Sequence, residues 1–366
     1  MSPLPTSNYQ DLYSLLAYPL RLCAAATLTT YVLSLITGNV SQVDRVWTFL
    51  PTIYTAYWAL LPLWPLKSAY WRFLLPFVPE EASYFARHLS PRALLILGLT
   101  VLWTFRLSYN TWRRGLFRLD EEDYRWAVLR TKVPPWLFQI INLVFIALIQ
   151  NVLLLLIASP ALIAATHPTP LTLTDGVLAL TALALLAWEF TADNQQFAFH
   201  AWKHGTYDPR AHWPGARLAW TEHDAARGFC TRGLWAWSRH PNFFAEQSFW
   251  AVINLIPLLS LRDAPPLVPA HESTLADALR ALVPLSPSLA LCLLFVSSTR
   301  FTESISESKY PRGYAAYRAR VAMFVPPLTP VWSALLSLRG KKGDVDDLVW
   351  GPGAREAETK DRVKAE

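Results

Sequence analysis

Charged residues are scarce in this 366-residue chain, since Lys, Arg, Asp and Glu make up 16% of it against 53% hydrophobic residues. A soluble domain usually carries about a quarter charged residues, so the composition excludes an ordinary soluble enzyme. We detect no internal repeat, and no polar linker divides the long apolar stretches. The sequence therefore predicts one membrane domain over residues 1–337 and a charged, disordered tail at 338–366.

The chain also lacks several features that would indicate other classes of protein. Its three cysteines, Cys23, Cys230 and Cys292, have spacings that suit neither a disulfide framework nor a metal site. No basic region or small-residue cleavage site marks the N-terminus, so we expect no cleaved signal peptide. His200 and His204 are spaced to share a metal on a helix, but they form a single such pair, and we predict no metal. The net charge of +6 lies in particular loops, which favours lipid or phosphate contacts and no nucleic acid.

Long apolar stretches are abundant instead. A helix needs roughly 17–25 residues to cross a hydrocarbon core of about 30 Å. Seven stretches meet this condition, near residues 15–36, 46–66, 92–109, 135–158, 173–192, 243–261 and 282–299. Backbone polar groups must be satisfied inside lipid, which leaves helices as the reasonable structure. The fold class predicted is an all-α, polytopic membrane helix bundle of about seven transmembrane helices.

Lys and Arg alternate between the predicted connections. The loop at 110–133 carries six, the loop at 159–172 none and the loop at 193–242 six. Two follow in 262–281, and twelve lie from residue 300 onward. The positive-inside rule therefore predicts that the tail and the loops at 110–133 and 193–242 are cytosolic.

Polar residues gather where the longest basic loop meets the neighbouring spans. The segment RGLWAWSRHPNFFAEQSFW, residues 232–250, enters the sixth predicted span and contains the candidates Arg232, Arg239, His240, Asn242 and Glu246. Asn242 and Glu246 are four residues apart and would share one helix face. Glu189 and Asp193 have the same spacing at the end of the fifth span.

Such a set would suit a ligand with ribose hydroxyls and phosphates. A carboxylate at a membrane boundary is costly unless it is paired or bound to a ligand, and guanidinium groups fork onto phosphate oxygens. The sequence thus indicates a cofactor pocket on the cytosolic side of the bundle. The alternative for the same residues is a structural ion-pair network joining two helices.

Two further segments could complete this pocket. The third span ends in RLSYNTWRRG, which places Asn110, Arg113 and Arg114 at its cytosolic rim. After the seventh span, the segment TRFTESISESKYPRGYAAYRARVAMFVPPLTP has two glutamates four apart and two tyrosines, Tyr314 and Tyr317, three apart. A solvated, salt-bridged loop and simple interfacial anchoring are the alternatives for these two segments.

Several of these motifs, in this order, resemble the steroid 5α-reductase C-terminal family, and in particular its uncharacterised branch of polytopic membrane proteins. The motifs are VDRVW, WTFRLSYNTWRRG, EDYRW, WEFTADNQQ, GLWAWSRHPNFFAE and YAAYRARVAMFVP, and they span nearly the whole chain from the second predicted helix to Pro326. The same superfamily contains sterol C14 reductases, which use NADPH, and isoprenylcysteine carboxyl methyltransferases, which use S-adenosylmethionine.

The resemblance implies cofactor contacts at Asp193, Arg232, Asn242, Glu246 and Tyr317, with Arg113 and Arg114 at the phosphate end. It also implies hydride transfer from NADPH to a carbon–carbon double bond in a lipid. Steroid reductases polarise the substrate carbonyl with a Glu and a Tyr. Here the tyrosine position falls at Leu102 or Trp103, and the second span offers no carboxylate. The substrate half of the family pattern is therefore not matched, and a 3-oxo-steroid is not predicted.

These observations together predict an integral membrane oxidoreductase of the endoplasmic reticulum that uses NADPH to reduce a sterol or other lipid. Methyl transfer from S-adenosylmethionine is the alternative reaction, although the many arginines favour a phosphate-rich cofactor. A catalytically silent membrane protein that binds a lipid or a partner is the alternative from another class.

Overall fold

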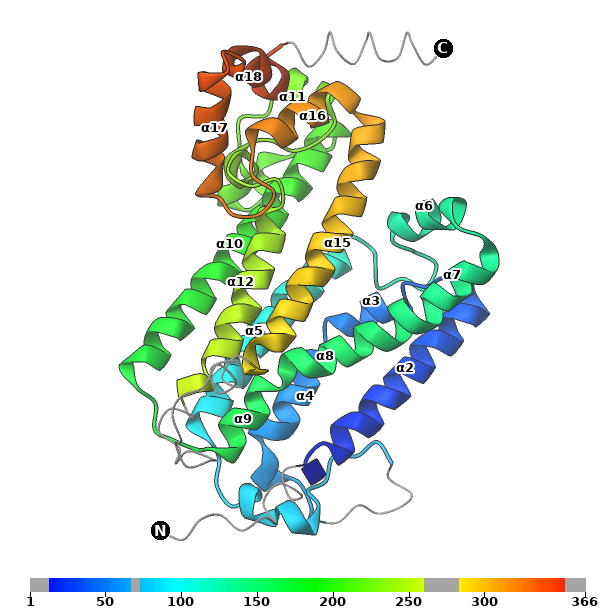
Figure 1. Cartoon of the computed structure of the whole chain (residues 1–366), viewed down its shortest axis with the longest axis vertical. Helices are drawn as coiled ribbons and strands as arrows, with labels where there is room; N and C mark the ends of the chain where they lie inside the picture. The colour runs from blue at the N-terminus through cyan, green and yellow to red at the C-terminus, as the bar shows by residue number, and fades with distance from the viewer. Residues whose placement is uncertain (1–12, 67–72, 260–282, 353–366) are drawn as a thin grey trace. The chain divides into compact units, whose positions relative to one another are not determined.

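The computed structural model describes residues 13–66, 73–259 and 283–352, and these residues form helices and loops but no β-strand (Figure 1). The chain divides into two compact units, which are described separately below. Unit 1 comprises Met1–Ala182 and Trp250–Leu291, and unit 2 comprises Leu183–Phe249 and Cys292–Glu366. Three helices, α10, α12 and α15, contribute residues to both units.

Among the described residues, unit 1 holds eight complete α-helices, one π-helix and three 3-10 helices. They are α2 Ala17–Thr37, α3 Gln42–Trp47, α4 Leu50–Ala59, η1 Leu61–Leu63, η2 Glu80–Ala86, α5 Pro91–Arg113, α6 Tyr124–Lys132, α7 Pro135–Ile141, the π-helix η3 Asn142–Ile149, α8 Gln150–Ala158, α9 Pro160–Thr166 and η7 Val283–Leu285. Proline at the first turn suits a helix start, because its missing N–H has no intrahelical partner there. Pro91, Pro135 and Pro160 begin three of these helices in this way.

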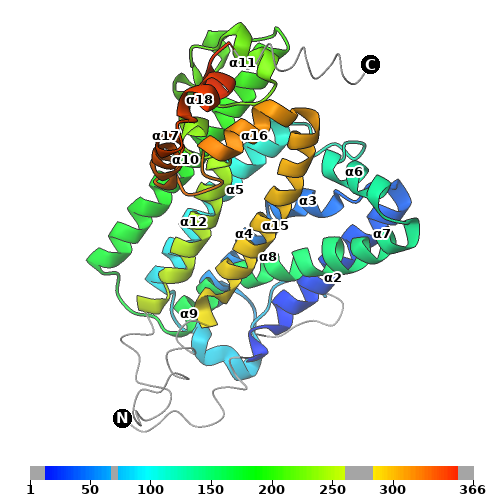
Figure 2. The same ribbon diagram turned by 45° about the horizontal axis from the view of Figure 1, so that its top comes forward.

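Interhelical hydrogen bonds hold the apolar helices of unit 1 together. Asn142 Nδ2 donates to Ser34 Oγ at 2.8 Å, and Asn151 Nδ2 donates to Thr30 Oγ1 at 3.2 Å, which joins α2 to η3 and α8. Small polar side chains commonly make such contacts between membrane helices. Figure 1 and Figure 2 both show α2 running beside the continuous α7–α8 rod.

Unit 2 contains the rest of the described helices. They are α10 Leu173–Lys203 from residue 183, η4 Pro209–Ala211, η5 Pro214–Ala216, α11 Glu222–Arg227, η6 Gly233–Ala236, α12 Pro241–Leu255 up to residue 249, α15 Ser286–Lys309 from residue 292, α16 Pro311–Arg320, α17 Leu328–Leu338 and α18 Lys342–Trp350. At 31 residues, α10 is about 46 Å long at 1.5 Å per residue. It is thus longer than the hydrocarbon core needs.

Five helical stretches among the described residues are long and apolar enough to cross a membrane: Ala17–Thr37, Pro91–Arg113, Pro135–Thr166, Leu173–Lys203 and Val283–Lys309. They confirm five of the predicted spans and the all-α membrane fold class. The stretch predicted as one span at 46–66 is not one continuous helix, because α3 and α4 are separate helices and α4 ends at Ala59. The prediction at 243–261 was too long, since α12 ends at Leu255, and its last two residues lie outside the described residues.

The tail at 338–366 was predicted to be disordered, and this is wrong for residues 342–350. They form α18, whose Val345, Leu348, Val349 and Trp350 pack against Tyr314 and Tyr317 of α16. An ion pair adds to this packing, because Arg320 Nε of α16 lies 2.7 Å from Asp346 Oδ1 of α18. The net charge and mean hydropathy of the tail do not reveal these contacts with α16. Residues from 353 onward lie outside the described residues.

Candidate functional site

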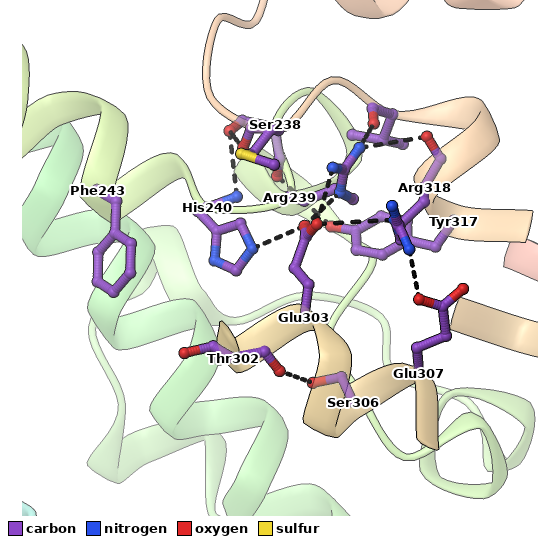
Figure 3. A network of polar contacts seen from close by, with 12 residues as sticks. Ser238, Arg239, His240, Phe243, Thr302, Glu303, Ser306, Glu307, Tyr317 and Arg318 are labelled. Carbon is purple, nitrogen blue, oxygen red and sulfur yellow. Dashed lines mark hydrogen bonds and ion pairs between the residues drawn. The ribbon is translucent and has the colours of Figure 1, made fainter. Parts of the chain in front are cut away.

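A buried carboxylate, Glu303 of α15, lies at the centre of a polar network in unit 2 (Figure 3). The guanidinium of Arg239 holds it with two hydrogen bonds, Nε to Oε1 at 2.6 Å and Nη2 to Oε2 at 3.1 Å. His240 Nε2 lies 3.0 Å from the same Oε1 atom. Bidentate pairing of this kind fixes the geometry as well as the charge, so Arg239 and His240 are both fixed by one acid.

The segment that carries Arg239 and His240 is bound to the end of α16 by its backbone. The amide of Arg239 donates to Ala322 O at 2.9 Å, and the amide of His240 donates to Met323 O at 3.1 Å. Arg239 Nη1 also donates to the carbonyls of Arg318 and Val321. Most donors of this guanidinium are therefore used within the protein, which gives Arg239 a positioning role in the described structure.

Tyr314 and Tyr317 were predicted to line the pocket, and the structure buries both in the core of unit 2. Tyr317 Oη donates to Trp235 O at 2.6 Å, so the hydroxyl binds the backbone of η6. Phe229 lies against both rings, with centroid distances of 5.1 Å to Tyr314 and 5.4 Å to Tyr317. Burial raises the pKa of each tyrosine above its ordinary value, which favours the neutral hydroxyl.

The predicted residues of α10 and α12 lie together in unit 2. Asn242 Nδ2 donates to Asp193 Oδ1 at 3.1 Å, which joins the two helices. Glu189, one turn before Asp193, and Glu246, one turn after Asn242, are also buried. The equal spacing seen in the sequence thus places an amide and three carboxylates on helices that contact each other.

A glycine holds the loop before α12 close to α10. Gly233 has a φ of 64°, in the left-handed region that other residues avoid. A Cβ at this position would lie 2.6 Å from Gln195 Oε1, and that same oxygen accepts from the amide of Leu234 at 2.9 Å. Gly233 therefore permits the close approach that sets the position of the following segment.

Arg232 lies in a second ionic cluster of unit 2. Its Nε donates to Asp224 Oδ2 at 2.6 Å, and Arg227 Nη1 donates to Asp224 Oδ1 at 2.8 Å. Burial raises the pKa of Asp224, but hydrogen bonds from Thr221, Arg227 and Arg232 outweigh it and hold the pKa below its usual range. The carboxylate stays ionised and orients Arg232, whose side chain is 30% exposed.

Asn110, Arg113 and Arg114 belong to unit 1, at the end of α5. Arg113 Nε donates to Asn110 Oδ1 at 3.0 Å. The other nine predicted residues, twelve minus these three, all lie in unit 2. Glu303 and Arg318 were not among the predicted site residues. The four-residue spacing of Glu303 and Glu307 in the sequence could have indicated Glu303.

Two comparisons with known proteins relate the chain to proteins whose activity is not assigned. A family model described as "Protein of unknown function (DUF1295)" matches residues 30–321. A relative in Schizosaccharomyces pombe, "Uncharacterized protein C594.04c", is 32% identical over 296 residues, which cover 80% of this chain and 74% of the relative. No solved structure matches the chain. Neither match names a steroid 5α-reductase, so that resemblance stays a prediction.

Proposed function

We propose that this chain, which belongs to the DUF1295 family of unknown function, is a membrane reductase that uses NADPH to reduce a carbon–carbon double bond in a sterol or other lipid. One observation carries the proposal. Nine of the twelve residues predicted to contact a cofactor occur in unit 2, where Asn242 and Asp193 of different helices are hydrogen-bonded at 3.1 Å.

The residues present fit the chemical groups of NADPH. Carboxylates accept hydrogen bonds from ribose hydroxyls, and a side-chain amide both accepts from them and donates to them. These are the roles proposed for Asp193, Glu246 and Asn242. Arg232 donates its Nε proton to Asp224, while its Nη groups make no hydrogen bond to the described residues. An oriented guanidinium with free Nη donors is suited to a phosphate. The bound cofactor would supply the hydride.

The proposal includes an orientation and a compartment. The excess of Lys and Arg in the loops at 110–133 and 193–242 and after residue 300 supports a cytosolic location for these segments. NADPH is then bound from the cytosol, and the lipid substrate comes from the bilayer, which we propose to be the endoplasmic reticulum membrane.

Binding of radiolabelled NADPH to the detergent-purified chain tests this function, with S-adenosylmethionine as the parallel ligand. Asp193→Asn keeps the shape of the side chain but removes its charge, and we expect it to weaken NADPH binding by about tenfold or more. Asp344→Asn, a change of the same chemistry at an exposed site of α18, should leave the affinity unchanged.

The other outcomes reject the proposal in different ways. Binding of S-adenosylmethionine without NADPH would move the chain to methyl transfer. Binding of neither ligand by a monodisperse protein would favour a silent lipid-binding protein. Equal NADPH affinity in Asp193→Asn and Asp344→Asn would show that the predicted residues of α10 and α12 do not bind the cofactor.

A further inference from the structure

Unit 2 has an open cavity of about 380 Å³ at its surface that the proposed cofactor residues leave unused, apart from Arg239 in its wall. Glu307, Arg318, Met323 and Trp332 line it, together with two alanines of α16. This volume is in the range of small-molecule sites. The lining combines two guanidinium groups and one carboxylate with a flat aromatic wall, so it suits a ligand that has both an anionic group and apolar parts.

Arg318 is the cation of this cavity that a ligand can reach. Its side chain is 44% exposed, and the only hydrogen bond of that side chain within the described residues goes from Nη1 to Glu307. Its Nε also lies 3.7 Å from Glu303 Oε2, which is a longer ion pair. Glu307 is similarly exposed, at 40%, and such half-exposed ion pairs contribute little to stability. A ligand phosphate can therefore replace Glu307 on the guanidinium, whereas Arg239 keeps its buried partner Glu303.

The helix that provides Trp332 also has an apolar stripe on its outer face. Leu328, Val331, Leu335 and Leu338 of α17 follow one another at spacings of three, four and three residues, and they are 44%, 48%, 40% and 84% exposed. Residues at these spacings form one continuous face of a helix. The opposite face, with Thr329 and Leu336, is buried, so α17 is apolar on both the inner and the outer side.

Trp332 connects the stripe to the cavity. Leu328 lies four residues before it and Leu335 three residues after it, so both are its neighbours on the helix surface. The charges of residues 339–347 cancel: Arg339, Lys341 and Lys342 are followed by Asp344, Asp346 and Asp347. Attraction to an anionic surface in general is thus weak here, and a charged ligand would depend on Arg318.

We propose that this cavity binds the phosphate of a glycerophospholipid headgroup on Arg318, with the acyl chains lying along the exposed stripe of α17. A protein with membrane-spanning helices is surrounded by glycerophospholipids, so such a ligand is present at high local concentration. The site goes beyond the proposed reductase function and does not depend on it, because it needs neither NADPH nor a reducible bond.

Native mass spectrometry of the delipidated full chain in detergent tests the site without NADPH. The probes are dioleoyl phosphatidic acid, the matching diacylglycerol, which lacks the phosphate, and inorganic phosphate. We expect retention of phosphatidic acid but not of diacylglycerol. Arg318→Gln should weaken this binding by about tenfold or more, whereas Arg210→Gln, at an exposed arginine of the same unit, should bind like the wild type.

Two more variants keep the proposal falsifiable. Ala315→Trp would fill the cavity and leave Arg318 in place, and it too should lose the lipid. The double variant Leu328→Ser and Leu335→Ser should weaken the binding of phosphatidic acid several-fold, because apolar contacts with the acyl chains are lost. Wild-type lipid affinity in both Arg318→Gln and Ala315→Trp would overturn the proposal. Displacement of the lipid by millimolar inorganic phosphate, with no effect of the serine variants, would show a free-phosphate site instead.

Discussion

Two buried arginine–carboxylate pairs, Arg92–Asp175 in unit 1 and Arg239–Glu303 in unit 2, differ in what surrounds them. In unit 1, Arg92 donates to Asp175 from Nε at 2.7 Å and from Nη2 at 2.8 Å, and both side chains are almost fully buried. Thr172 adds hydrogen bonds to the same carboxylate from its amide and its hydroxyl. The charges and hydrogen-bonding groups of this buried pair are used within the protein, as expected for a pair that connects α5 to α10 structurally.

The Arg239–Glu303 pair in unit 2 is instead connected to more exposed residues. Glu303 is held by Arg239 and His240 on the buried side, and Arg318 Nε lies 3.7 Å from its other oxygen. Arg318 in turn binds Glu307 at a half-exposed position beside the cavity (Figure 3). The same residue types therefore form an enclosed pair in unit 1 and a network that reaches a half-exposed position in unit 2.

The largest expected effect breaks the enclosed pair of unit 1. Asp175→Leu leaves the buried guanidinium of Arg92 without its counter-charge, which we expect to lower the free energy of unfolding by about 3–5 kcal/mol. The measurement is thermal unfolding of the purified protein in detergent. The double change to Arg92→Met and Asp175→Leu should recover most of the loss, because no buried charge then remains. A double variant as unstable as the single one would contradict the pairing argument.

A smaller effect concerns Asp44 of α3, in unit 1. Burial and the neighbouring charge of Asp123 raise the pKa of Asp44 to about 6. The folded state then binds the proton more tightly than the unfolded chain. This contribution to stability is present at low pH and is lost as the pH rises through about 6. Asp44→Asn should thus stabilise the protein by about 1–3 kcal/mol at pH 7 and have little effect near pH 4.

Unfolding by denaturant at a series of pH values measures this difference. Asp344→Asn provides the control, since that carboxyl is exposed on α18. A gain for Asp44→Asn that stayed constant from pH 4 to pH 7 would show that titration of Asp44 is not the cause.

The sequence predicted local features of both units better than their long-range contacts. The five long helices were visible because hydropathy and length suffice to define them. The stretch at 46–66 was predicted as one helix and is interrupted, because Pro51 follows the end of α3 and an average hydropathy does not reveal a helix break. The joining of Asn242 to Asp193 was within reach, because both motifs have helical spacing and lie at the ends of consecutive predicted spans.

Two parts of unit 2 could not be predicted in this way. Glu303 is 64 residues from Arg239, and no local pattern pairs residues at that distance. The buried position of Tyr317 depends on the backbone carbonyl of Trp235, which accepts a hydrogen bond from the tyrosine hydroxyl. Every residue has a backbone carbonyl, so the sequence does not show which one accepts a hydrogen bond. A buried tyrosine and a tyrosine that faces a ligand therefore give the same sequence pattern.

The smallest expected effect has the opposite pH dependence and belongs to His240 in unit 2. Burial lowers its pKa below the ordinary 6.5, against the attraction of Glu303 and together with the repulsion of Arg239. The unfolded chain then binds the proton more tightly, so stability is complete above about pH 6.5 and is lost as the pH falls below it. His240→Gln should flatten this acid slope, which is at most about 1.4 kcal/mol per pH unit for one proton. Denaturant unfolding between pH 5 and pH 7 measures it, and a variant with the wild-type slope would assign the acid sensitivity to other groups.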